Sequence, residues 1–209
     1  EGSQLLSFIL SRPSVPVVRT QSEFDKLFKG AMEILGEVKL LQIPTQRVLS
    51  AQQLLARAEA LDPRSAEVKR QLGRCSYRLG LYTKAEESYK KAVELAPGSA
   101  AGYNSLGVLL SNVFKRHSEA EELFRKAISL DPSFAPTYAS LAFLLDTGLK
   151  RRSEAEMLYR KTIELDPKNT WAIVNLANLV MDLRASDSEA EQLLWTAIRL
   201  EPLESPPYR

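Results

Sequence analysis

The sequence is poor in the residues from which most catalytic and metal sites are built. Its 209 residues include one cysteine, Cys75, and one histidine, His117. A single cysteine excludes a disulfide within the chain and leaves no material for a cysteine metal cluster. Nucleophile–base pairs of the Ser-His-Asp or Cys-His kind lack the residues they need, and the scattered glycines form no phosphate-binding loop. We therefore expect a protein that is not an enzyme and that has no cofactor and no metal site.

Two further absences concern partners and location. The net charge is only +2, so no strong overall field favours nucleic acid or an anionic membrane. No apolar run approaches the roughly 20 residues that a membrane-spanning helix needs. The lone cysteine fits a reducing compartment, and we expect an intracellular, cytoplasmic protein. The chain begins at Glu1 rather than methionine, which predicts a fragment or a processed product whose upstream targeting signal would lie outside this sequence.

What the sequence does contain is one segment that returns at a fixed interval. Residues 118–132 (SEAEELFRKAISLDP) return at 153–167 (SEAEMLYRKTIELDP), again at 188–202, and more loosely at 83–97. The prolines that close these segments, counted from Pro63, are spaced by 34, 35, 35 and 35 residues. A period of this length is typical of helical solenoids, in which each unit buries its apolar face only against its neighbours.

The pattern predicts that each unit is a pair of antiparallel helices joined by a short turn. Small residues in the first helix let the two helices approach closely, and they are Gly73, Gly107, Ala142 and Ala177. An aromatic residue or leucine in the second helix fills the space between units: Tyr89, Phe124, Tyr159 or Leu194. Three units carry one extra residue in the turn, near Lys115-Arg116, Lys150-Arg151 and Arg184-Ala185. We expect His117 to be a solvent-exposed turn residue before an N-cap at Ser118.

This arrangement resembles the tetratricopeptide repeat, a helix pair of about 34 residues. The resemblance covers residues 64–202 as four repeats, namely 64–97, 98–132, 133–167 and 168–202. Residues 22–63 resemble a degenerate fifth helix pair. The resemblance implies an all-α fold, a right-handed superhelical solenoid of antiparallel helix pairs with about ten helices.

The two ends of the chain differ from the repeats. Residues 1–21 contain two prolines and no helical period, so we expect an extended N-terminal arm. The arm is either a flexible tail or a segment whose residues 5–18 dock on the helical body or on a partner. Ser22 is the expected N-cap of a helix that runs to about Gln42. Residues 203–209 should form a non-helical tail, so more chain, a partner or a second copy in a homo-oligomer would cover the outer face of the last repeat.

The resemblance also implies where a partner binds, because the first helix of each repeat lines a concave groove in this family. The groove residues that we select as partner-binding candidates are Arg70, Arg74, Arg78, Asn104, Asn112, Phe143, Asn175 and Asn178. The arginines recur every four residues as a basic stripe that favours an acidic residue in the ligand; alternatively, they are a solvated face. The asparagines suit an extended peptide backbone; alternatively, Asn175 or Asn178 bonds neighbouring helices, and Trp171 is a packing residue.

We therefore predict a non-catalytic protein–protein interaction scaffold that binds an extended or helical segment of a partner in its concave groove. The alternative is a substrate-recruiting or regulatory module of a larger enzyme or multiprotein complex. RNA binding is disfavoured by the near-neutral charge. Family members that clamp acidic chaperone tails use lysines and asparagines, and the matching positions here are Arg70, Arg74, Ser105, Pro136 and Ser140. We expect chaperone-tail binding to be weak or missing.

Overall fold

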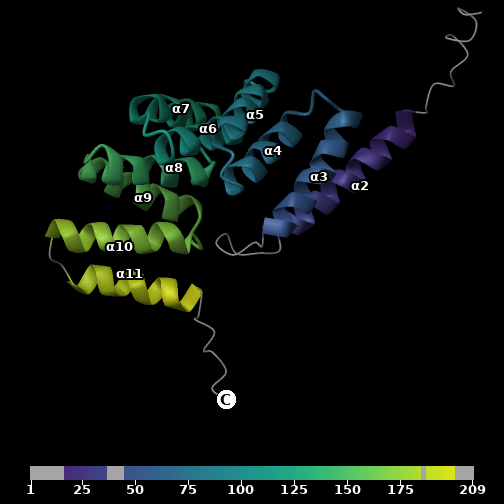
Figure 1. Cartoon of the computed structure of the whole chain (residues 1–209). Coiled ribbons are helices and arrows are strands. Elements are labelled where there is room, and N and C mark those ends of the chain that lie inside the picture. The colour runs from purple at the N-terminus through teal and green to yellow at the C-terminus, as the bar shows by residue number, and fades with distance from the viewer. Residues whose placement is uncertain (1–16, 37–44, 185–186, 201–209) are drawn as a thin grey trace, which may run out of the picture. The chain divides into compact units, whose positions relative to one another are not determined.

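The computed structural model describes residues 17–36, 45–184 and 187–200, and all regular structure in these ranges is helical (Figure 1). The all-α fold class predicted from the repeat is confirmed. The ten α-helices of the described residues, with the π-helical turn η1, are α2 (Val17–Gly36), α3 (Thr45–Leu61), α4 (Ala66–Arg78), α5 (Tyr82–Leu95), α6 (Ala100–Asn112), α7 (His117–Leu130), α8 (Ala135–Phe143), η1 (Leu144–Gly148), α9 (Arg152–Leu165), α10 (Thr170–Arg184) and α11 (Asp187–Leu200).

The contacts divide the chain into two compact units, Glu1–Ser88 and Tyr89–Arg209, which are described separately. In the first unit α3 packs against both α2 and α4. Their core is made of buried aliphatic residues at helical spacing: Leu27, Ala31, Leu35, Val48, Ala51, Leu55, Ala58, Val68 and Cys75. α2 and α3 thus form a helix pair where residues 22–63 were predicted to resemble a degenerate one, and their apolar residues recur at helical spacing.

The first helix begins at Val17, five residues before the predicted N-cap Ser22. Residues 17–21 are therefore helical and do not belong to an extended arm. Pro16 directly precedes Val17 in the sequence. Proline suits the start of a helix because it has no backbone N–H, and an N–H in the first turn would have no partner within the helix. Further inside a helix, the proline ring would clash with the preceding turn. The docking predicted for residues 5–18 includes Val17 and Val18, which belong to α2. Residues 5–16 of that segment, and the predicted end near Gln42, lie outside the described residues.

The second unit stacks the helices of successive repeats. Within repeats, α6 packs on α7, α8 on α9 and α10 on α11; between repeats, α7 packs on α8 and α9 on α10. Phe124 and Tyr159 are almost completely buried, which agrees with their predicted role of filling the space between units, and Phe124 also faces Gly107 of its own repeat. A Cβ added to Gly107 would lie 2.7 Å from Phe124 Cε1. The glycine therefore permits an approach of α6 and α7 that a larger residue would prevent.

The turns between paired helices show how an extra residue is accommodated. In the repeat without it, α4 ends at Arg78 and Gly80 follows at φ 73°. The Leu81 N–H donates to Ser76 O at 2.9 Å, which is a Schellman motif. In the next repeat Lys115 takes the left-handed conformation at φ 56°, and the Arg116 N–H reaches back to Leu110 O at 3.0 Å. The loop is thus one residue wider, and a lysine occupies the position of the glycine.

The third repeat absorbs its extra residue in the same way and also changes the helix. Lys150 has φ 59°, and the Arg151 N–H donates to Leu145 O at 2.7 Å. Ahead of this turn α8 continues into η1, whose π-helical bonding includes Leu149 N–H to Leu144 O at 3.0 Å. A π-helical turn inserts one residue into a helix without breaking its hydrogen bonding. The last residue of η1, Gly148, lies next to the imidazole of His117.

The prediction that His117 is a solvent-exposed turn residue is wrong. His117 is the first residue of α7 and is partly buried, and Arg116 takes the N-cap position that was predicted for Ser118. A Cβ added to Gly148 would lie 3.2 Å from His117 Nδ1 and Cε1. The N-cap thus lies two residues before the predicted one, and the imidazole packs on the next repeat.

Ion pairs join the second helices of successive repeats. Arg125 Nη2 on α7 lies 2.7 Å from both Glu121 Oε1 and Glu154 Oε1, and Arg151 bonds the same two carboxylates at 2.8 and 2.5 Å. The arrangement continues one repeat later, where Arg160 bonds Glu156 at 2.9 Å on its own helix and a carboxylate of α11 at 2.5 Å. The pairs thus act within single helices and also connect successive repeats.

Candidate functional site

An exposed apolar strip follows one side of α10 and meets the end of α8. Trp171, Val174 and Met181 are 47%, 37% and 45% exposed. Together with the exposed Asn178 they recur at intervals of three and four residues, so they share one helix face. We call these four residues and Phe143 of α8 the α8–α10 surface. The opposite side of α10 is buried through Ala172, Ile173, Leu176, Ala177, Leu179 and Val180.

Aromatic contacts fix Trp171 at one end of this surface. The centroids of the Trp171 and Phe143 rings are 5.4 Å apart at an interplanar angle of 51°. The fully buried ring of Tyr159 on α9 meets Trp171 edge to face at 6.2 Å. Burial, with a contribution from the carboxylate of Asp146, raises the pKa of Tyr159. Trp171 is therefore both a packing residue, as the alternative prediction held, and a half-exposed side chain held in a defined orientation.

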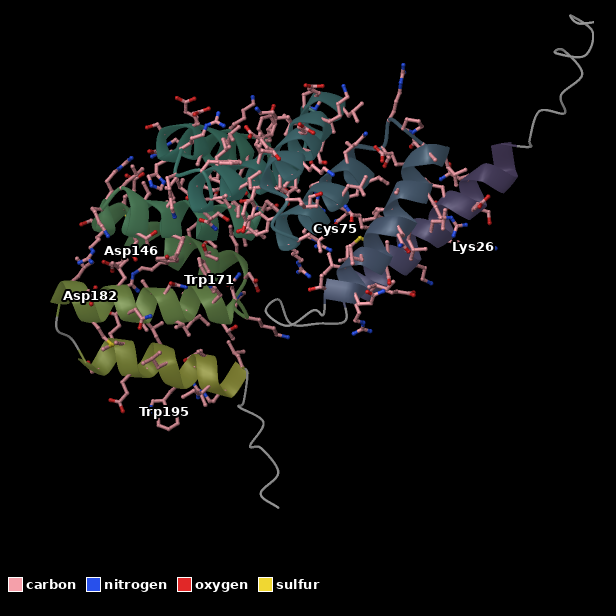
Figure 2. All side chains as sticks on the ribbon, in the orientation of Figure 1. Lys26, Cys75, Asp146, Trp171, Asp182 and Trp195 are labelled. Carbon is pink, nitrogen blue, oxygen red and sulfur yellow. The ribbon has the colours of Figure 1, made fainter. Side chains whose placement is uncertain are left out.

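Two carboxylates lie at the other end of the surface. Arg152, at the start of α9, places its Nε 3.5 Å from Asp146 Oδ1 and its Nη2 3.4 Å from Asp182 Oδ2. The side chain of Asp182 is 63% exposed, and those of Asp146 and Arg152 are 20% and 40% exposed. In Figure 2, Asp146 and Asp182 lie near the same end of α10, and Trp171 lies near its start. Arg152 thus bridges the end of α8–η1 to the end of α10.

The asparagines predicted to bind a partner lie in different environments. Asn112 and Asn178 are exposed, whereas Asn104 and Asn175 are partly buried. Asn175 Nδ2 donates to the Trp171 carbonyl at 2.7 Å, so part of its bonding capacity is used within α10 rather than between helices. Asn104 Oδ1 is buried without a hydrogen-bond partner among the described atoms. Asn178 is therefore the asparagine best placed to bond a ligand on the α8–α10 surface.

The predicted arginine stripe lies on α4 in the first unit and is not a simple solvated face. Arg70 donates to Glu67 through Nε at 2.8 Å and through Nη2 at 2.5 Å. Burial of the Glu67 carboxyl opposes its ionisation, but hydrogen bonds from Arg70 and Gln71 and the charge of Arg74 lower its pKa. Arg70, Arg74 and Arg78 are all partly buried. Part of the positive charge of this stripe is thus neutralised within α4.

Sequence reasoning passed over the residues that make the α8–α10 surface most distinctive. Trp171, Val174, Met181, Asp146 and Asp182 occupy groove positions implied by the resemblance but were not selected. For Trp171, Val174 and Met181 the signal was the apolar spacing along one face of residues 171–181, which is visible in the sequence. The role of Arg152 in joining the two carboxylates had no such signal, because it depends on how three helices meet.

The last helix also exposes large apolar side chains. Trp195 and Ile198 of α11 are 57% and 46% exposed. A hollow of about 460 Å³ is lined by Gln192, Trp195, Thr196 and Arg199. Trp195 Nε1 lies 3.4 Å from Glu191 Oε1, so its indole is oriented by its own helix.

Two searches of the described residues bear on other kinds of site. No three His, Cys, Asp or Glu side chains among these residues lie where they could hold a metal ion. None of the described helices combines the length and the apolar character needed to cross a membrane.

Comparison with known proteins agrees with the helix pairs. Sequence models of the tetratricopeptide repeat match residues 45–100 and 100–134. A comparison with curated proteins returned no match.

Several solved structures have a similar fold. TTC0263, a tetratricopeptide protein of Thermus thermophilus, is 21% identical with a TM-score of 0.72, over 87% of this chain and 93% of that one. MamA is 25% identical with a TM-score of 0.60, over 75% and 90% of the two chains. YrrB, described as a tetratricopeptide protein with an unusual peptide-binding site, is 17% identical with a TM-score of 0.55, over 85% and 86%. The two sequence matches show that residues 45–134 are tetratricopeptide repeats, and the chain shares the fold of solved tetratricopeptide proteins.

Proposed function

We propose that the protein is a non-catalytic interaction scaffold and that it binds a segment of a partner protein on the α8–α10 surface. The observation that carries this proposal is the row of exposed apolar side chains on α10, anchored by Trp171 and accompanied by Asn178. Exposed apolar groups that lie together, with polar groups beside them, are typical of protein–protein contact sites.

The apolar side chains of this surface can supply part of the binding energy of a specific contact. Complete burial of a large apolar side chain stabilises a complex by about 1.5–3 kcal/mol. Trp171, Val174 and Met181 are each between a third and a half exposed. Covering them would therefore contribute on the order of 3 kcal/mol before the cost of ordering the ligand. Asn178 can donate to and accept from a ligand backbone, which fixes register more than it adds affinity.

The similar fold of YrrB supports a peptide ligand only as a precedent, since YrrB is described as having a peptide-binding site. If the natural protein is a module of a larger enzyme or complex, the same surface would recruit that assembly's substrate or subunit. The arginine stripe of the first unit remains a second proposed contact, one that favours an acidic residue. A homo-oligomer through the exposed side chains of α11 remains a further proposal.

The proposal is tested by selecting peptides from a phage-displayed random library on the full chain and measuring their Kd for variants. Met181→Asp and Val174→Asp should each weaken binding of the selected peptides by tenfold or more, since each buries a charge in the apolar contact. Met157→Asp is the matched control, because Met157 is a 64% exposed methionine on α9, outside this surface. Equal effects of Met181→Asp and Met157→Asp, with unchanged circular dichroism, would refute the assignment of the site.

A second comparison separates binding of a partner from occupation of the surface by the chain itself. Deletion of residues 1–16 leaves every described helix in place. If residues 5–16 dock on the α8–α10 surface, the deletion should tighten binding of a selected peptide. We expect no change, because the proposal assigns the surface to a partner.

A further inference from the structure

We infer that the α8–α10 surface selects a segment that combines apolar side chains with a lysine or arginine placed near Asp146 and Asp182. This inference rests on the proposed function and adds the charge of the ligand to it. The ligand expected here carries a positive charge, whereas the arginine stripe of the first unit favours an acidic ligand. The two preferences belong to different units of the chain.

The first reason is the sign of the charges on the groove positions of the second unit. The groove positions that the resemblance implies on α6 and α8 are uncharged: Ala101, Asn104, Ser105, Val108, Ser111, Asn112, Pro136, Ala139, Ser140 and Phe143. Among the groove positions of η1 and α10, one carboxylate comes from each, Asp146 and Asp182. The only cation that the described contacts give these carboxylates is Arg152. Two negative charges share one positive charge, so the cluster of Asp146, Arg152 and Asp182 is net negative.

The second reason is that Arg152 satisfies neither carboxylate well. Its distances of 3.5 and 3.4 Å exceed the roughly 2.7–2.9 Å of a strong charge-assisted hydrogen bond. The pairs between Arg125 and its two carboxylates show that this fold can hold an arginine at 2.7 Å when the geometry permits. Asp182 is 63% exposed and keeps acceptor positions open to a ligand. A ligand cation can therefore bind without displacing a tight internal pair.

The third reason is that the acidic cluster is continuous with the apolar strip. Phe143 contacts Trp171 near the start of α10, and Arg152 joins Asp146, three residues after Phe143, to Asp182 near the end of α10. From Trp171 to Asp182 the helix advances about 16 Å, at about 1.5 Å per residue. About five residues of extended chain, or about eleven residues of helix, span this length. The ligand should thus present an apolar or aromatic residue at one end and its cation at the other.

The test uses synthetic peptides taken from the library selection, each prepared with its basic residue and with glutamine in that place. Asp182→Asn should weaken binding of the basic peptide roughly threefold to fivefold, the upper part of the range for an exposed ion pair. Binding of the glutamine peptide should stay within twofold. Glu164→Gln, which removes a carboxylate 67% exposed on α9, should change neither. Raising the salt concentration should remove most of the difference between the peptides.

The outcomes separate the inference from the function on which it rests. Peptides that need Val174 and Met181, are enriched in lysine or arginine and respond to Asp182→Asn support both. Peptides that need Val174 and Met181 but bind equally with glutamine, and ignore Asp182→Asn, overturn the inference and leave the proposed function standing. Peptides whose binding is independent of Val174 and Met181 overturn both.

Discussion

Replacing Gly107 by alanine should destabilise the protein, although alanine is the better helix former. The added Cβ would lie 2.7, 3.0 and 3.1 Å from three ring carbons of Phe124. Phe124 is 1% exposed, so its ring has no open space to enter, and α6 and α7 must separate. Overpacking of this kind costs about 1–3 kcal/mol. The helix propensity gained in replacing glycine offsets about 1 kcal/mol of that cost.

A second glycine of α6, Gly102, provides a control at which alanine should have the opposite effect on stability. A Cβ at Gly102 would meet its nearest atom, Val93 Cγ2, at 3.4 Å, which is an ordinary contact. Gly102→Ala should therefore stabilise by up to about 1 kcal/mol, while Gly107→Ala should destabilise by about 1 kcal/mol net. In a chain of this size each kcal/mol moves the melting temperature by about 2–4 °C.

Urea and thermal unfolding followed by circular dichroism would measure both changes. Phe124→Leu in the Gly107→Ala background should recover part of the loss, because it removes the ring that the Cβ meets. If Gly107→Ala raises stability as much as Gly102→Ala does, the close approach of α6 and α7 does not limit this position.

Three further predictions concern other features. Lys150→Gly should stabilise by up to about 1 kcal/mol in urea unfolding, since Lys150 has φ 59° and a left-handed conformation is costly for residues with a Cβ; Lys150→Val should destabilise. A hydrogen bond from Arg125 and the charge of Arg151 lower the pKa of Glu154 in the folded state below its ordinary 4.5. The ionised Glu154 side chain therefore stabilises the folded state fully above pH 4.5, and this contribution is lost as the pH falls through the folded pKa. The urea midpoint of Glu154→Gln should depend less on pH in that range than the midpoint of the unmodified protein. Burial raises the pKa of the Cys75 thiol despite the charges of Arg74 and Arg78. A thiol reagent should therefore modify Cys75 only as fast as the first unit opens. Labelling of Cys75 without denaturant at the rate of a free thiol would contradict its burial.

The period of the sequence was sufficient to predict the helix pairs, because it reflects packing that each repeat must make with the next. The proline spacing and the small residue at Gly107 therefore predicted the fold correctly. The turns were harder. The extra residue near Lys115 was visible, but its left-handed conformation and the shifted start of α7 at His117 depend on how the next repeat packs. The start of α2 at Val17 was missed because a good capping residue, Ser22, lies further along.

The candidate site shows the same division between local and tertiary information. The helical spacing of Trp171, Val174 and Met181 is local and could have indicated the exposed strip. The pairing of Arg70 with Glu67 is also local, three residues apart on one helix, and could have been predicted. By contrast, Asp146 and Asp182 are separated by 36 residues in the chain. Asp146 and Asp182 meet the same arginine, Arg152, only because α9 packs against both η1 and α10.

The most direct test of the proposed binding surface uses the fluorescence of Trp171. The chain has two tryptophans, so Trp195→Phe leaves Trp171, 47% exposed, as the only reporter. A peptide selected on the full chain should shift the emission of this variant to shorter wavelength, saturably, with the Kd measured for the unmodified chain. The account is contradicted if the peptide binds with unchanged Kd and leaves Trp171 emission unaltered, while the converse variant, Trp171→Phe, reports binding through Trp195.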